Sequence, residues 1–205
     1  SKTLGISIPK TFPEYLLHKM LLVVKDGQEV KMSKRAGTYV TLRDLVDWVG
    51  RDAARFFLVS RKSDAEFVFD INLACSKSDE NPVYYLQYAH ARICSVMRKA
   101  VEAGIDYRQV DTAKVKPSEK EISLIQHLAD FPAVVAEAGR IYSPSLIANY
   151  VYDLVKEYNQ FYHDYSILRE ENAEVRAFRL MLSANVAKVI KTGMGLLGIE
   201  VPDRM

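Results

Sequence analysis

From Asn81 to its C-terminal end, the sequence is a succession of long helical patterns with recognisable start and stop residues. Asn81-Pro82 is typical of a helix start, because proline fits the first helical turn, and Gly104 is typical of a helix end. Ser118-Glu119-Lys120-Glu121 has the spacing of a capping box and predicts another helix start. Further helix boundaries are predicted in the same way. One helix start is predicted at Pro132, and another at Pro144, where Ser143 is the cap and the helix covers 145–163. The last helix is predicted from Asn172 to Gly193. We therefore expect an antiparallel helical bundle over roughly 80–205.

The residues before position 80 have shorter and more mixed patterns. Leu21–Lys25 and Glu29–Met32 are apolar-rich segments on either side of Asp26-Gly27, a dipeptide that favours a hairpin turn. An isolated hairpin is unstable in water, and nothing downstream obviously supplies a partner sheet, although 66–69 has the pattern of a short extended piece. We therefore expect residues 1–30 to be the end of a larger α/β unit.

Short helices are also predicted in this first part. The run from Leu16 to Met20 has a helical pattern, and a second helix is predicted over 52–61. Between them, Thr41 is a candidate N-cap, with Asp44 in the first turn and Gly50 as the stop. The fold class is therefore mostly α, with a small α/β part followed by the helical bundle.

Composition excludes several classes of protein. Hydrophobic residues make up 49% and charged residues 26%, an ordinary globular balance. The longest apolar runs, such as Phe56–Val59, are too short to span a membrane. The two cysteines, Cys75 and Cys94, fit a reducing compartment, and we expect neither a disulfide framework nor a zinc site.

Charge and aromatic residues are distributed unevenly. The stretch from Lys31 to Lys62 has eight basic and three acidic residues, whereas 76–205 has 16 basic and 17 acidic residues. Ten of the 12 tyrosines lie from Tyr84 onward. Positive charge suited to phosphates therefore lies early in the chain, and flat aromatic surface lies late. Such a split also arises by chance from solvated faces.

The early charge is concentrated in Lys31-Met32-Ser33-Lys34-Arg35-Ala36-Gly37-Thr38, between a strand-like segment and a capped helix. Lysine is a point charge on a flexible stem, so it follows a group whose charge moves during a reaction. Such cations stabilise the negative charge that develops on a leaving pyrophosphate. The motif therefore predicts a loop that closes on a polyphosphate, and the alternative is an exposed basic turn.

The late aromatic residues include a candidate RNA-binding stripe. Tyr84, Tyr88 and Arg92 are spaced by four residues, so they share a helix face. Tyrosine and arginine planes hold unstacked RNA bases, each stack contributing roughly 1–3 kcal/mol. Tyrosines at helical spacing are more often core or boundary residues, and we interpret four others in that way: Tyr150, Tyr152, Tyr158 and Tyr165. The histidines are scattered, no metal site is predicted, and His90 is interpreted as structural.

Several motifs together resemble a known family. Lys31-Met32-Ser33-Lys34 is similar to the second signature of class I aminoacyl-tRNA synthetases. The resemblance to bacterial arginyl-tRNA synthetases extends over nearly the whole chain, through these segments: Val40–Leu45, Asp52–Phe57, Asp79–Arg92, Phe161–His163, Leu196–Ile199 and Pro202–Met205. The first signature of class I, His-x-Gly-His, is absent from these 205 residues.

The resemblance implies that this chain is a C-terminal part of a larger enzyme. Residues 1–78 would be the last part of the catalytic domain with the Lys-Met-Ser-Lys loop, and 79–205 the helical anticodon-binding domain. The larger enzyme would use ATP, with Mg²⁺ as the nucleotide counter-ion, to attach arginine to tRNA(Arg) through arginyl-adenylate. The resemblance further implies a cytoplasmic enzyme, and we expect a monomer. The chain alone is expected to be inactive.

The resemblance also assigns roles to individual residues. Lys34 would contact the ATP phosphates and stabilise the transition state, Lys31 would assist, and Met32 and Ser33 would position the loop. The anticodon-binding positions implied by the resemblance are Tyr88, Arg92, Tyr162 and Met205.

Two alternatives remain open. The chain is also compatible with the tail of another class I synthetase, although the Asn81–Tyr85 run and the closing Pro202–Met205 favour arginine. A noncatalytic helical RNA-binding or scaffolding module is the alternative from a different class. It leaves the Lys31–Arg35 segment without a purpose.

Overall fold

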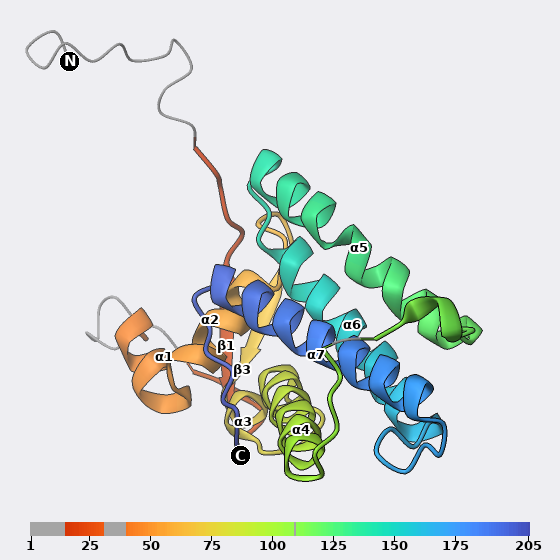
Figure 1. The fold of residues 1–205 in the computed structure, drawn as a ribbon. Helices are drawn as coiled ribbons and strands as arrows, with labels where there is room; N and C mark the ends of the chain where they lie inside the picture. The colour runs from red at the N-terminus through yellow and green to blue at the C-terminus, as the bar shows by residue number, and fades with distance from the viewer. Residues whose placement is uncertain (1–14, 31–39, 109) are drawn as a thin grey trace, which may run out of the picture.

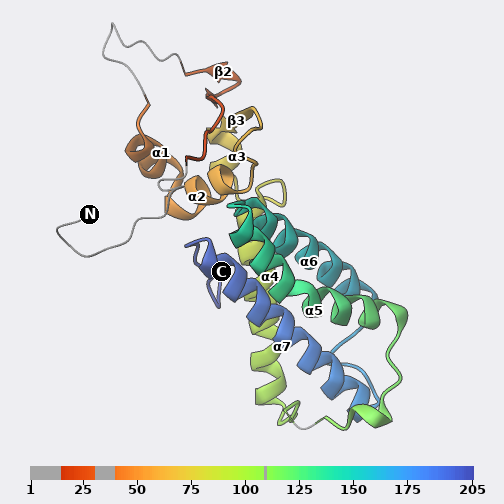
Figure 2. The ribbon, with the colours of Figure 1, turned by 90° about the horizontal axis from the view of Figure 1, so that it is seen from above.

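The computed structural model describes residues 15–30, 40–108 and 110–205. These residues form a small sheet with short helices beside it, followed by four long helices (Figures 1 and 2). The predicted phosphate-loop residues Lys31, Met32, Ser33 and Lys34 lie outside the described residues.

The sheet has three strands in the order β2-β1-β3. Strands β1 (Leu21–Lys25) and β2 (Gln28–Glu29) form the predicted hairpin. Asp26 and Gly27 both have positive φ, 53° and 73°, as a tight hairpin turn requires. Strand β3 (Phe67–Asp70) pairs with β1 in parallel and places Val23 opposite Phe69. The partner strand therefore comes from downstream, which the sequence analysis did not recognise.

Three short helices lie on one side of this sheet (Figure 1): α1 (Leu42–Val49), α2 (Arg51–Val59) and α3 (Ile71–Cys75). The N-cap predicted at Thr41 is present and belongs to a capping box, since the Thr41 N–H donates to Asp44 Oδ2 at 2.7 Å and the Asp44 N–H donates to Thr41 Oγ1 at 3.1 Å. Gly50 ends α1 at φ 82°, a conformation that favours glycine. The prediction of a helix over Leu16–Met20 is wrong: this segment is exposed coil, because a five-residue apolar run cannot offset the cost of helix nucleation without a surface to pack on.

The second part is an antiparallel bundle of α4 (Pro82–Glu102), α5 (Glu119–Arg140), α6 (Ser145–Asp164) and α7 (Ala173–Leu196) (Figure 2). Helix α6 packs against α4, α5 and α7. The connection from α4 to α5 contains a short 3₁₀ turn, Thr112–Lys114. One hydrophobic core runs from Val23 and Phe69 in the sheet to Leu154 and Ile190 in the bundle. None of the described helices is long and apolar enough to cross a membrane.

Two predicted boundaries and one predicted cap in the bundle are wrong. Pro132 lies inside α5 rather than at a helix start. Proline removes one intrahelical hydrogen bond, but α5 packs on α6 and this packing maintains the helix. Helix α7 continues past Gly193 to Leu196. Ser143 does not cap α6 through its side chain, because Pro144 occupies the N-cap position and Ser143 Oγ lies 2.9 Å from Ser145 Oγ.

The last residues return along the molecule to α4 (Figure 1). We call residues 197–205 the C-terminal strap. Leu197, Ile199 and Val201 are buried, whereas Glu200 and Asp203 face solvent. The strap therefore packs like an extended segment with one apolar side.

Candidate nucleic-acid interface

The predicted aromatic stripe is present on α4. The rings of Tyr84 and Tyr88 stack nearly parallel, with centroids 6.3 Å apart and an interplanar angle of 8°. Tyr88 is 45% exposed, which is unusual for a large aromatic side chain in a helix of the bundle. The Arg92 guanidinium lies one turn further on, 5.8 Å from the centroid of Tyr88. The four-residue spacing thus produces one continuous surface of flat groups.

Helix α6 holds the guanidinium of Arg92 in place. Tyr162 lies on its other side, with 4.7 Å between the guanidinium carbon and the ring centroid. Arg92 Nη2 donates to Asn159 Oδ1, and Asn159 Nδ2 donates to the Tyr85 hydroxyl at 2.6 Å. The Arg92 Nε atom is buried and has no hydrogen-bond partner among the described residues. Arg92 is therefore oriented by two helices before any ligand binds.

The strap completes the site at its open end. Tyr88, Arg92 and Met205 line one cavity of about 510 Å³, together with Ser95, Arg98 and Arg204. Met205 is 57% exposed, and Arg98 Nη1 fixes the strap by donating to the Asp203 carbonyl at 3.0 Å. Arg92, Arg98 and Arg204 bring positive charge to this cavity, and no acidic side chain of the described part of the chain lines it. The arrangement suits a flat base beside a phosphate.

The structure therefore brings together all four positions that the resemblance selected for anticodon binding. Tyr88, Arg92 and Met205 line one cavity, and Tyr162 joins them through its contact with Arg92. Asn159 and Arg98 belong to the same cluster but were not predicted. Arg98 follows Arg92 by six residues, a spacing that does not place two residues on one helix face, and nothing local connects Asn159 to Arg92, so neither residue had a clear signal in the sequence.

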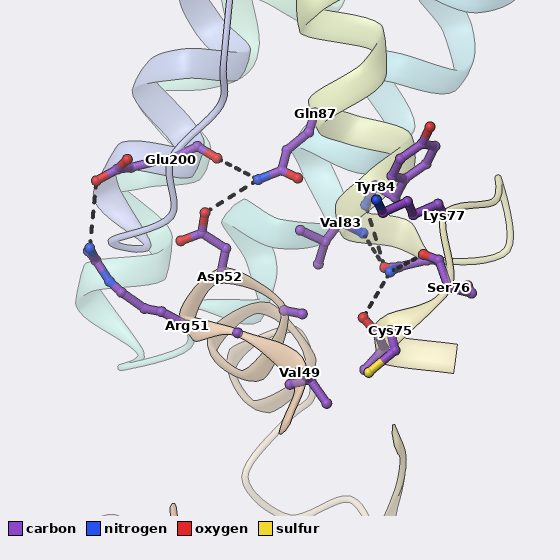
Figure 3. A pocket seen from close by; sticks show the side chains of 14 residues that line it. Val49, Arg51, Asp52, Cys75, Ser76, Lys77, Val83, Tyr84, Gln87 and Glu200 are labelled. Atoms are coloured by element: carbon purple, nitrogen blue, oxygen red, sulfur yellow. Dashed lines mark hydrogen bonds and ion pairs between the residues drawn. The ribbon is translucent and has the colours of Figure 1, made fainter. Parts of the chain in front are cut away.

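A second hollow lies on the other side of the Tyr84–Tyr88 stack, where α2 meets α4 (Figure 3). Its volume is about 450 Å³, and Gln87 is one of the residues that line it. Gln87 Nε2 donates to Asp52 Oδ2 at 3.3 Å and to the Glu200 carbonyl at 2.8 Å (Figure 3). Arg51 pairs with the Glu200 carboxylate at 3.6 Å. This hollow is mixed in charge, and its polar groups join the two parts of the chain.

Further hydrogen bonds join α2 and α4 to the strap. Arg55 Nε donates to the Leu197 carbonyl, and Arg51 Nη2 donates to the Gly198 carbonyl at 3.0 Å. These carbonyls follow the C-terminal end of α7, where positive side chains are stabilising. Further along, the buried His90 donates from Nδ1 to the Pro202 carbonyl at 3.0 Å, in agreement with its predicted structural role. Burial, together with the Asp203 carboxylate, raises the pKa of the neighbouring Cys94 thiol above its usual value.

A helical bundle with stacked tyrosines and an arginine-lined open cavity has the features of a domain that binds single-stranded RNA. The protein-family model described as the DALR anticodon binding domain matches residues 86–205, and the chain belongs to this family.

Individual relatives extend the similarity to the remaining residues. An arginine–tRNA ligase from Bordetella parapertussis is 50% identical over 202 residues, which are 98% of this chain and 36% of that protein. A Campylobacter jejuni crystal structure, provisionally named an arginyl-tRNA synthetase, superposes on this chain with a TM-score of 0.78 and is 31% identical in sequence. The match covers 92% of this chain and 40% of the Campylobacter jejuni chain. Thermus thermophilus arginyl-tRNA synthetase superposes with a TM-score of 0.68 and is 26% identical in sequence. That match covers 89% of this chain and 34% of the Thermus thermophilus chain. The chain thus spans just over a third of the length of the curated relative.

Proposed function

We propose that this chain is the tRNA-reading part of an arginine–tRNA ligase, and that it binds the anticodon loop of tRNA(Arg) through Tyr88, Arg92, Tyr162 and Met205. The observation that carries the proposal is the position of Arg92 between Tyr88 and Tyr162, at the edge of a cavity completed by Met205. An unstacked base that enters this cavity meets an aromatic face, a guanidinium plane and a thioether. Such groups bind bases by stacking and by hydrogen bonds to base edges.

The near-neutral charge of the bundle is compatible with this role. Residues 76–205 have about equal numbers of acidic and basic residues, so phosphate attraction over the whole surface is weak. Arg92, Arg98 and Arg204 concentrate positive charge at the cavity. Stacking and base-edge contacts then supply most of the binding free energy. Stacking holds any base, so the base-edge hydrogen bonds supply the dependence on sequence.

We also propose that the larger enzyme is cytoplasmic, forms arginyl-adenylate from arginine and ATP, and transfers the arginyl group to the tRNA. Lys31 and Lys34 would bind the ATP phosphates, with Met32 and Ser33 positioning their loop and Mg²⁺ accompanying the nucleotide. This part rests on the sequence motif and on the identity to arginine–tRNA ligases. A parallel pair of strands is normally covered on both faces, whereas Leu22 and Val68 lie side by side and exposed, at 39% and 51%. This apolar face supports the presence of a covering layer in the longer protein.

The anticodon proposal is tested by measuring the affinity of the chain for tRNA(Arg) transcripts with and without a changed central anticodon cytosine. We expect the change to weaken binding by about tenfold or more, since the new base leaves the groups that bonded the cytosine edge unpaired, at a cost of roughly 1–3 kcal/mol. Arg92→Met should weaken binding similarly, because it removes the guanidinium from between the two rings. Deletion of Asp203–Met205 should also weaken binding while far-ultraviolet circular dichroism stays unchanged.

The chain offers a matched control for Arg92. Arg108 lies over the ring of Tyr107 at 5.9 Å, a similar pair beyond the C-terminal end of α4. Arg108→Met should leave the affinity for tRNA(Arg) within about twofold, because an exposed contact of this kind contributes only about 0.5–1 kcal/mol and lies outside the cavity. Equal affinity for both transcripts, or equal effects of the two arginine substitutions, would contradict the proposal.

A further inference from the structure

The strap accepts hydrogen bonds along its backbone from side chains of two helices. Five of its carbonyl oxygens have a side-chain donor, and no backbone N–H of the described residues donates to them. The pairs, in strap order, are Arg55 with Leu197, Arg51 with Gly198, Gln87 with Glu200, His90 with Pro202 and Arg98 with Asp203. An extended segment normally satisfies its carbonyls by pairing with a neighbouring strand. Side chains of α2 and α4 take the place of that strand here.

The three donors on α4 form one stripe along the helix. Gln87, His90 and Arg98 lie within about 80° of one another around the helix axis, because each helical residue advances by about 100°. The neighbouring stripe carries Tyr88 and Arg92. The strap therefore runs along α4 next to the aromatic stripe.

His90 is the most enclosed of these donors and lies near the end of the strap. Only 2% of His90 is exposed, and its Nδ1–H donates to the Pro202 carbonyl at 3.0 Å. Pro202 precedes Met205 by three residues, a length of chain that spans at most roughly 10 Å. This hydrogen bond therefore restricts the positions that Met205 can reach, and the observed one lines the cavity with Tyr88 and Arg92.

Gln87 fixes the strap at an earlier point. Its Nε2 atom donates to the Glu200 carbonyl at 2.8 Å and to Asp52 Oδ2 at 3.3 Å (Figure 3). Both N–H bonds of the amide are then used, so the amide has one defined orientation. The strap is thus anchored on α4 at Glu200 and again at Pro202.

We propose that His90 and Gln87 are positioning residues for tRNA binding. Their hydrogen bonds hold the strap so that Met205 lies at the cavity before RNA binds, and neither side chain contacts the RNA. Ordering the strap in advance removes a cost that binding would otherwise include. This inference rests on the proposed function of the cavity and adds that affinity depends on polar groups outside it.

The test compares His90→Leu with His90→Asn. Leucine and asparagine have the same branched shape, but only asparagine has a donor, an amide nitrogen bonded to Cγ as Nδ1 is. We expect His90→Leu to bind tRNA(Arg) about three- to tenfold more weakly than His90→Asn, the range that one neutral hydrogen bond covers. In a chain that lacks residues 203–205 the two variants should bind equally, because Met205 is no longer there to be positioned. An equal difference with and without residues 203–205 would overturn the proposal.

Gln87→Met is the second variant, at a position that is only partly buried and so tolerates substitution better. It should also weaken binding in the full chain and have no effect in the chain that lacks residues 203–205. Gln126→Met, at an exposed position on α5, is the matched control and should leave the affinity within about twofold. Equal effects of the two glutamine substitutions would contradict the role of Gln87.

A measurement without RNA separates this proposal from the proposed function. In a chain labelled with ¹³C at the methionine methyl groups, the Met205 resonance is identified by its absence from the chain that lacks residues 203–205. His90→Leu and Gln87→Met should move this resonance toward its random-coil position, whereas the resonance of the fully buried Met194 should stay in place. A Met205 resonance that stays in place in both variants would overturn the proposal, even where the chain binds tRNA(Arg) as proposed. Equal affinity of the unmodified chain for the two anticodon transcripts would instead contradict the proposed function, and with it any positioning role in tRNA binding.

Discussion

The described tyrosines range from exposed to fully buried, and they differ in what their hydroxyls contact. Tyr88 is 45% exposed beside the cavity, whereas Tyr158 is fully buried and donates its hydroxyl proton to Ser183 Oγ at 3.1 Å. Tyr150 is also buried and donates to the His127 carbonyl. The prediction that Tyr150 and Tyr158 are core residues is confirmed. Burial raises the pKa of Tyr150 to about 12 and raises the pKa of Tyr158 further.

These raised pKa values predict a loss of stability at alkaline pH. Tyrosines in the unfolded chain ionise near pH 10, while the folded chain keeps Tyr150 and Tyr158 neutral. Above about pH 10 the unfolded state therefore binds fewer protons than the folded state, so the free energy of unfolding falls as pH rises. The stabilisation is complete below pH 10 and is lost as pH rises toward and past 12. The urea midpoint measured from pH 9 to 12, with tyrosinate absorbance followed in parallel, checks this.

Tyr158→Phe is the informative variant. Ser183 Oγ donates to the Arg179 carbonyl at 2.7 Å, so it keeps a partner when the Tyr158 hydroxyl is removed. We expect a smaller alkaline loss of stability in this variant than in the unmodified chain. An identical dependence on pH would show that Tyr158 ionisation is not coupled to unfolding.

The candidate site could be predicted from sequence only in part. Tyr88 and Arg92 share a helix face, and the four-residue spacing is enough to place them side by side. Tyr162 and Met205 come from α6 and the strap, so only resemblance to a family pointed to them. Asn159 was missed because its role depends on the packing of α6 against α4.

Helix starts were the most predictable elements, because a cap depends on residues that are neighbours in sequence. The N-cap at Thr41 and the capping box at Ser118 are present where the sequence indicated them, and the last helix begins at its predicted place, with Asn172 as the cap. Boundaries that depend on tertiary packing were not predictable: α5 passes through Pro132, and α7 passes through Gly193. The same limit applies to β3, whose partner β1 lies more than forty residues earlier.

Gly193 lies inside α7 and does not end the helix. Its role is in packing, because neighbouring helices occupy the space that a side chain would fill. A Cβ added there would lie 2.6 Å from Val151 Cγ2 on α6 and 3.5 Å from the ring of Phe131 on α5. The absence of a side chain therefore permits close approach of three helices.

Gly193→Ala is expected to lower the free energy of unfolding by about 1–3 kcal/mol, the usual effect of overpacking a core. Gly195→Ala is the matched control in the same turn, because a Cβ there meets nothing within 4 Å. That substitution should be neutral or stabilise the chain by up to about 1 kcal/mol through helix propensity. Urea unfolding of both variants measures the difference. Equal effects would mean that α6 yields to the added methyl group.

For the whole molecule, the strap adds hydrogen bonds between the two parts, which also share one hydrophobic core. It contacts α2 through Arg51 and Arg55, then α4 through Gln87, and ends in the cavity at Met205. The helices α1 and α2 in turn follow directly after the Lys31–Lys34 motif. The general fold class could be predicted because helical periodicity and caps are local properties. The path of the strap could not be predicted, because its contacts join residues more than a hundred positions apart.

The proposed division of labour between the two parts leads to a prediction for the longer protein. If Lys34 stabilises charge on the ATP phosphates, Lys34→Ala should slow arginine-dependent ATP–pyrophosphate exchange by about 10²–10³-fold, as removal of one transition-state donor does in other enzymes. The affinity for tRNA(Arg) should stay within about twofold, because Tyr88, Arg92 and Met205 belong to the other part of the chain. Lys99→Ala, at an exposed position near the end of α4, is the control for a general loss of positive charge. Equal losses of exchange rate and tRNA affinity would assign Lys34 to RNA binding or folding instead. A selective loss of the exchange rate would separate the chemistry of the phosphate loop from recognition by the bundle.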